Sequence, residues 1–385
     1  MNGILILLSP ITTWLAASPW LRLQIVFLLF YSAYYSISSL RHNRICITND
    51  IILILLFLSA LYISAIINVY DWNTKSLNHI LAMSFITICM YIIPRHTLRN
   101  EVKNELKVNY LHIFSKIAFY TLAGCVSLDF IAINLYKINI SDFLTISNVK
   151  NGNHYHILGN IRSAAGPTEE PAVAAYYLAL LYMTSGALAK TARTRTTHVQ
   201  VAALSISIAL TFSSVGYLLL AGILFIEFRK FSFTKYAIGL ITLLYATFNY
   251  ETIYNLLEGI SFFDKITLSI ENRSASLRMH SWRLFYNAYL AEPYFGIAPG
   301  FNNILVLTGV HSTFFTILIN YGIITLLPFV LFLISIFTNT KDSNLKLYFI
   351  ISLLPHLIAD YYFSLVFWIF IAVIASINEH HKQES

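Results

Sequence analysis

The chain has 385 residues, of which 57% are hydrophobic and only 11% are charged, and its mean hydropathy is +0.66. About a quarter of the residues in soluble domains are charged, so this composition excludes a large soluble protein and predicts an integral membrane protein. The net charge of +7 would suggest nucleic acid for a soluble chain. In a membrane protein it reflects the Lys and Arg of cytoplasmic loops, so we expect no nucleic-acid partner.

Apolar stretches of about 20 residues, enough to cross roughly 30 Å of hydrocarbon, fill most of the chain. We therefore expect one all-α membrane domain over residues 1–385, with about twelve transmembrane helices. No Lys or Arg precedes the first apolar stretch, which favours a membrane helix over a cleaved signal peptide. The predicted spans are 3–19, 22–40, 50–69, 77–94, 109–136, 171–189, 199–213, 214–228, 235–254, 312–337, 345–361 and 362–378.

Two consecutive pairs of these spans, 199–213 with 214–228 and 345–361 with 362–378, are short. Each pair is either a tight hairpin or two tilted, partly re-entrant helices. The three cysteines, Cys46, Cys89 and Cys125, lie far apart and show no metal-binding spacing, so we expect them to be packing residues.

Lys and Arg, including Arg95 and Arg99, concentrate in the short loops that lie inside if both termini are cytoplasmic. The positive-inside rule therefore predicts a multi-pass protein with both termini in the cytoplasm. The two long loops, 137–170 and 255–311, then both face outward, and we expect both of them to carry short amphipathic helices. Because long ordered loops are usually functional, we expect the chemistry at the outer face.

The first outer loop ends in polar residues and glycines directly before a span, namely Gly159, Arg162, Gly166, Glu169, Glu170 and Pro171. An Arg here can bind an anionic head group, and a carboxylate can act as a base. The alternative is an Arg that reaches to lipid phosphate, with glutamates that favour the positive end of a helix dipole.

The second outer loop contains Leu277, Ser281, Leu284 and Ala288 at helical spacing, which predicts an amphipathic interfacial helix over 273–290. Arg278 and Trp282 are four residues apart and share a face of this helix. Pro293 should end it, whereas Gly296 and Gly300 permit tight turns. His311 lies where the next span begins and can move a proton near neutral pH. The alternative is a basic helix that adheres to anionic lipid, with His311 as a helix cap.

Four ionisable residues, Asp129, His79, His356 and Asp360, lie within or near the ends of apolar stretches. Such groups suggest a function, for example a proton relay, unless they lie close to water at helix ends. The sequence has no Walker, HExxH, GxSxG or CxxC signature, which argues against an ATPase, zinc peptidase, serine hydrolase or redox enzyme.

The order of these features resembles the O-antigen polymerase and O-antigen ligase superfamily of bacterial envelope glycosyltransferases. The resemblance covers roughly residues 150–330 and is carried by Arg162, Gly166 and Glu170-Pro171, then Arg278-x-x-x-Trp282, Pro293, Gly296 and Gly300, then His311 and Tyr321-Gly322. Family members often carry an Arg in the turn that reads Phe212-Ser213-Ser214-Val215-Gly216 here. Without that Arg, a phosphate-binding role for this turn is in doubt.

The resemblance implies a bacterial inner-membrane glycosyltransferase that works at the periplasmic face by block transfer. A growing chain would leave undecaprenyl diphosphate and move onto the next lipid-linked repeat unit. We expect Arg278 and Arg162 to stabilise the leaving diphosphate, and His311 to act as the catalytic base, with Glu170 as second choice. Further substrate contacts are expected from Arg273, Arg283, Trp282, Glu169, Gly296 and Gly300.

On this interpretation arginines neutralise the diphosphate, so no metal or other cofactor is required. The expected partners are the undecaprenyl-diphosphate-linked oligosaccharide, membrane lipids and, by resemblance, a polysaccharide chain-length regulator. The Glu170-Pro171 step favours a polymerase over the ligase that passes the finished chain to lipid A-core. A flippase should show an internal repeat, and none is visible in the sequence, so transport is the weakest of the three alternatives.

Overall fold

The computed structural model describes residues 1–12, 23–42, 47–72, 74–140, 156–158, 161–192, 194, 198–228, 286–287, 289–299 and 312–384. These residues form twelve α-helices and one small β-hairpin, which confirms the mostly helical fold. Five helical stretches are long and apolar enough to cross a membrane, and four more apolar helices have 10–17 residues. The fold is compatible with a membrane protein, but the number of twelve spans is not confirmed. The predicted span 235–254 lies outside the described residues.

The five long stretches fall close to predicted spans. They are α3 (Asn49–Ile67); α4 (Thr74–Ile86) continued by the π-helical turn η2 (Thr87–Ile92) and α5 (Ile93–Val102); α6 (Glu105–Ile131) continued by the π-helical turn η3 (Ala132–Tyr136); α8 (Pro171–Thr191); and α16 (Thr313–Asn339). A 3-10 turn, η1 (Val69–Asp71), follows α3. Proline suits the first turn of α8 because its ring fixes φ and that N–H needs no helical partner.

The other helices are α1 (Asn2–Leu8), α2 (Leu23–His42), α9 (His198–Thr211), α10 (Ser214–Phe228), α17 (Ser343–Ile358) and α18 (Leu365–Glu384). With 14 and 15 residues, α9 and α10 are only about 21–23 Å long, which is shorter than the hydrocarbon layer. They pack against each other and against α8, and a left-handed residue, Phe212, ends α9. The predicted short pair is therefore two separate helices joined by a tight turn.

The expectation of one helix over 3–19 is wrong in its first half, because α1 ends at Leu8. Pro10 follows within two residues and cannot donate a helical hydrogen bond. The backbone N–H and the hydroxyl of Thr12 instead donate to the carbonyl of Pro167, at 3.0 and 3.2 Å. The chain after α1 is therefore tied to the segment that precedes α8.

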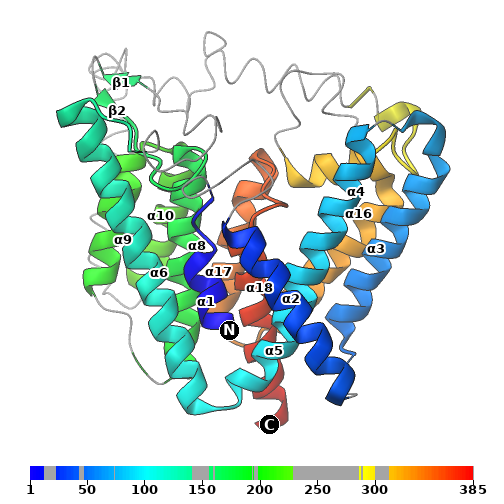
Figure 1. The fold of residues 1–385 in the computed structure, drawn as a ribbon, viewed down its shortest axis with the longest axis horizontal. Helices are drawn as coiled ribbons and strands as arrows, with labels where there is room; N and C mark the ends of the chain where they lie inside the picture. The colour runs from blue at the N-terminus through cyan, green and yellow to red at the C-terminus, as the bar shows by residue number, and fades with distance from the viewer. Residues whose placement is uncertain are drawn as a thin grey trace, which may run out of the picture.

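The helices form one bundle, in which α8 and α18 are the central elements (Figure 1). Both are buried almost all round, as expected for helices that are apolar on every face. α6 packs along α8, α16 packs along α3, and α18 packs between α5 and α8. We call the end that carries the β-hairpin and residues 289–299 the loop end, and the opposite end, with the last turns of α5 and α18, the C-terminal end.

The described parts of both predicted outer loops lie at the loop end (Figure 1). In the first loop they are not helical: β1 (His156–Leu158) pairs antiparallel with β2 (Ile161–Arg162). The expected short amphipathic helix is therefore wrong for these residues. In the second loop, residues 286–287 and 289–291 are helical and the helix ends before Pro293, as predicted. The remainder of 273–290 lies outside the described residues.

Helix α16 is broken at Gly322, whose φ of 74° lies in the left-handed region. Residues 293–297 enter this break and replace its missing helical bonds. Ile323 and Ile324 of α16 donate to the carbonyls of Pro293 and Tyr294, and Ile297 donates to Ile319 at 2.9 Å. A Cβ on Gly322 would lie 2.1 Å from the Tyr294 oxygen, so only glycine fits.

Candidate functional site

Four of the predicted site residues, Arg162, Glu169, Glu170 and Gly296, are described, and all four lie at the loop end. The other six, Arg273, Arg278, Trp282, Arg283, Gly300 and His311, lie outside the described residues. The predictions for those six therefore stay predictions. His311 is nevertheless adjacent in sequence to Ser312, which caps the N-terminus of α16.

Arg162 is exposed on β2, and its backbone is held from η3, the turn that continues α6. The side chain of Asn134 accepts from the Arg162 N–H at 2.7 Å and donates to its carbonyl at 2.9 Å. The strand is thus fixed while the guanidinium side faces outward, which suits a residue that binds an anionic ligand.

Asp129 holds the segment after β2 in place. Its carboxylate is buried and accepts the backbone N–H groups of Ala165 and Gly166, each at 2.9 Å. Gly166 has a φ of 57° and packs against the Val126 backbone, where a Cβ would be crowded. The geometry assigns Asp129 a structural role and gives no support to the proton relay considered for it.

The two glutamates stand at the start of α8. Glu170 is the half-buried N-cap residue, and Thr168 donates a hydrogen bond to its carbonyl at 3.0 Å, while Glu169 is exposed. This position at a helix N-terminus agrees with the electrostatic alternative for these acids. It leaves their side chains on the same end of the bundle as Arg162.

Gly296 lies in the break of α16, where its φ is 69° and a Cβ would meet the backbone of Asn320 and Tyr321 at 2.5–2.6 Å. The carbonyl of Phe295 accepts from Ser64 and Asn68 of the α3 end, at 2.5 and 3.0 Å. Gly296 therefore serves close backbone packing. It lies on the other flank of the loop end from Arg162, so the described site residues are not brought together (Figure 1).

Between these flanks, the α17–α18 turn meets the first turns of α16 and α8 in a buried polar network. The Thr313 hydroxyl lies 2.9 Å from His356 Nδ1 and donates to Asp360 Oδ1 at 3.2 Å. Thr316 donates to Asp360 Oδ2 at 3.0 Å. The hydroxyl of Tyr176 on α8 lies 2.8 Å from His356 Nε2. His356 is 1% exposed, whereas Asp360 is only half-buried.

The directions of these bonds follow from donor counting. Thr313 has one hydroxyl proton, which Asp360 accepts when the carboxylate is ionised. His356 then donates to Thr313 from Nδ1, and its Nε2 accepts from the Tyr176 hydroxyl, which also lies 3.2 Å from the Ser352 carbonyl. The imidazole is neutral in this arrangement, and a line of hydrogen bonds runs from Tyr176 to the Asp360 carboxylate. Every donor to that carboxylate in the described residues is a neutral hydroxyl or the Tyr362 N–H.

The same turn fixes the chain next to His311. Ser312 donates to the carbonyl of His356 at 3.1 Å, and the Thr313 N–H donates to the carbonyl of Ala359 at 3.2 Å. Ser312 and Thr313, which follow His311, are therefore hydrogen-bonded to the α17–α18 turn that contains Asp360. A second histidine, His79, lies 2.7 Å from the Tyr321 hydroxyl, beside the break of α16.

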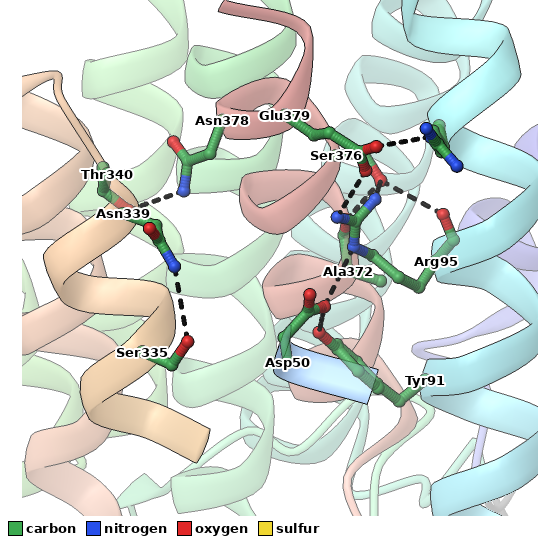
Figure 2. A network of polar contacts seen from close by, with 11 residues as sticks. Asp50, Tyr91, Arg95, Ser335, Asn339, Thr340, Ala372, Ser376, Asn378 and Glu379 are labelled. Atoms are coloured by element: carbon green, nitrogen blue, oxygen red, sulfur yellow. Dashed lines mark hydrogen bonds and ion pairs between the residues drawn. The ribbon is translucent and has the colours of Figure 1, made fainter. Parts of the chain in front are cut away.

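A second buried network lies at the C-terminal end (Figure 2). The Arg95 guanidinium is bound by Asp50 at 3.2 Å and by Glu379 at 2.8 Å, and Arg99 binds Glu379 at 2.6 Å. Tyr91 donates to the same Asp50 oxygen at 2.5 Å. Arg95, which the sequence analysis counts among the inner-loop cations, lies within α5, and its 4% exposed side chain bridges α3, α5 and α18.

A cavity of about 250 Å³ opens beside this second network, lined by Thr48, Asn49, Asp50, Arg95, Ile336, Asn339, Ala375, Asn378 and Glu379. The network contains two arginines and two carboxylates, so its formal net charge is zero. Opposite charges that satisfy one another leave little attraction for a charged ligand, so we interpret this cluster as a structural brace.

Sequence reasoning named His356 and Asp360 as ionisable residues in apolar stretches, but it missed Tyr176, Thr313 and Thr316. Threonine and tyrosine are common in apolar helices, and nothing in their spacing distinguishes these three. The described residues contain no group of three or more His, Cys, Asp or Glu side chains that could hold a metal ion. No protein-family model matches the chain, and a search of curated proteins gives no match.

Proposed function

We propose that the chain is a membrane-embedded glycosyltransferase that polymerises undecaprenyl-diphosphate-linked oligosaccharide units into O-antigen or a related surface polysaccharide. In this proposal the loop end faces the periplasm of a bacterial inner membrane, and both termini are cytoplasmic. The order of motifs in the sequence is the origin of the proposal, and the geometry of the loop end supports it.

The observation that carries the proposal is the half-buried Asp360 carboxylate at the loop end. It is held by neutral donors, lies beside the first turn of α16, and has no buried arginine beside it among the described residues. A carboxylate in this setting can accept a proton from an acceptor hydroxyl. We add Asp360 to His311 and Glu170 as a candidate for the base that activates the acceptor sugar.

The leaving diphosphate needs positive charge on the opposite side of the reacting sugar. Arg162 is exposed at the loop end on a strand whose backbone is fixed, and Arg278 is the second arginine that we assign to this role. The bond between the growing chain and its diphosphate breaks, the acceptor oxygen takes the chain, and the acceptor proton goes to the base. The lipid diphosphate leaves as the anion that the arginines bind.

Gene deletion distinguishes this function from its two alternatives. Loss of the ladder with core that carries a single repeat unit supports the polymerase. Bare core with polymer held on undecaprenyl diphosphate would identify the ligase, and units held at the cytoplasmic face would identify a flippase. A normal lipopolysaccharide ladder in the deletion strain would overturn all three.

Two substitutions test the residues predicted from the sequence. Arg278→Ala and His311→Ala should each abolish the ladder, while the protein still reaches the membrane in normal amount. The readout is complementation of the deletion strain, with membrane fractions blotted as the control. Unchanged ladders from both variants would show that the arginine and the base lie elsewhere.

A further inference from the structure

Asn320 lies in α16 two residues before the break at Gly322, and its side chain is buried without a hydrogen-bond partner among the described residues. Asn320 is 0% exposed, and neither its amide nitrogen nor its amide oxygen has a hydrogen-bond partner in the part of the chain that the structure describes. Buried amides are almost always paired, because an unpaired one costs about 1–3 kcal/mol or more. An unpaired amide in a folded protein therefore points to a partner that binds there.

The location of Asn320 connects it to the proposed reaction. Asn320 and Thr316 are four residues apart, so they lie on one face of α16, about 6 Å apart along its axis. Thr316 donates to the half-buried Asp360 at 3.0 Å. On this face of α16, Thr316, which contacts Asp360, is one turn closer to the loop end than Asn320. On the other side, the backbone of residues 293–297 is packed too closely to admit a ligand.

We propose that Asn320 is the floor of a sugar subsite, where its amide binds a hydroxyl or acetamido group of the lipid-linked substrate. The inference rests on the proposed function and deepens it. A primary amide offers donors and an acceptor side by side, and a hydroxyl or acetamido group offers the complement. A charged phosphate is excluded, because it would bring a second anion close to Asp360. Asn320 is thereby a specificity residue for the sugar next to the reacting bond.

The test uses the near-isosteric variant Asn320→Leu in purified full-length protein. Thermal unfolding is followed with no ligand, with undecaprenyl diphosphate, and with the undecaprenyl-diphosphate-linked oligosaccharide. Without ligand, the variant should melt at the wild-type temperature or a few degrees above it, because an unpaired buried amide is removed. A variant that melts several degrees lower would overturn the proposal, since the amide would then hold the fold or a structural water.

With ligands, the sugar-bearing lipid should stabilise the wild-type protein more than undecaprenyl diphosphate does. Asn320→Leu should keep the shift caused by the diphosphate and lose the increment caused by the sugar, with about tenfold weaker affinity for the sugar-bearing lipid. Thr325→Val is the matched control, because Thr325 is buried on the same helix and bonds only the carbonyl of Tyr321 in the described contacts. It should keep both shifts.

The outcomes separate this inference from the proposed function. If neither lipid stabilises the wild-type protein, the proposed function fails and the subsite fails with it. If the sugar increment is present in the wild type and persists in Asn320→Leu, the proposed function stands and the Asn320 subsite is wrong.

Discussion

The two polar networks of this protein lie at opposite ends of one bundle and are built on different principles. At the C-terminal end, Arg95 is shared by Asp50 and Glu379, so each charge is met by an opposite charge. At the loop end, the Asp360 carboxylate is held only by hydroxyls and an N–H among the described residues. Paired charges brace helices, whereas a carboxylate with neutral partners keeps its charge available for a substrate. The comparison predicts that the first network carries stability and the second carries activity.

The largest effect should come from Asp360→Asn. Removing the charge while keeping the shape should lower polymer formation by about 100-fold or more, in the range lost with a general base. The melting temperature should change little, because the amide oxygen can still accept from Thr313 and the Tyr362 N–H, and the amide NH2 can donate to the Thr316 hydroxyl oxygen. The readout is the ladder in a complemented deletion strain, with protein amount measured in the membrane.

Asp342→Asn is the matched control for that substitution. Asp342 caps α17 at the C-terminal end, where its Oδ1 accepts two backbone N–H groups, and asparagine caps a helix nearly as well. Its Oδ2 pairs with the exposed Lys190, and the loss of such a surface ion pair should cost only about 0–1 kcal/mol. Its ladder should be normal. Equal ladders from the two variants would remove Asp360 from the reaction.

A stability effect is expected from Arg95→Met. The substitution leaves the buried Asp50 carboxylate without its cation, while Glu379 keeps Arg99, and it should destabilise the protein by about 3–5 kcal/mol. Thermal unfolding in detergent measures the loss, and polymer formed per folded molecule should stay near the wild-type value. Normal stability with a lost ladder would place the activity at the C-terminal end and reverse the comparison.

The combination Asp50→Asn with Arg95→Met sharpens this result. It removes the carboxylate that Arg95→Met leaves without a cation, while Glu379 keeps Arg99, so most of the lost stability should return. If the double variant is no more stable than Arg95→Met alone, the loss comes from packing around the guanidinium and not from charge.

The smallest effect should come from Tyr176→Phe. It removes the hydroxyl that meets His356 at 2.8 Å and leaves the ring stacked on Tyr361. One neutral hydrogen bond is worth about 0.5–1.5 kcal/mol, so polymer formation should fall by roughly two- to tenfold. Tyr110→Phe on the exposed face of α6 should have no effect. An identical response from both would mean that the line from Tyr176 to Asp360 does not matter for turnover.

The sequence predicts the helices well because membrane spans are encoded locally, in runs of about 20 apolar residues. It does not predict the break of α16, because Gly322 becomes a break only when residues 293–297 fill it. The same holds for Arg95. Its sequence position resembles that of a loop cation, and its burial depends on contacts with α3 and α18, which are distant in the sequence. In the candidate site, His356 and Asp360 can be identified from the sequence because they are ionisable residues in apolar stretches. Their hydroxyl partners on α8 and α16 cannot be identified in this way.

The charged network at the C-terminal end also forms late in biosynthesis, because its residues are far apart in the sequence. Arg95 and Glu379 are 284 positions apart, so one partner leaves the ribosome long before the other. At about 5–20 residues per second, Arg95 waits roughly 15–60 s for its second carboxylate. During this interval the two arginines face only Asp50, and the four charges balance only when α18 arrives. A nonsense mutation upstream of the Glu379 codon would therefore leave the early helices without this carboxylate, and quality-control proteases should remove the truncated chain.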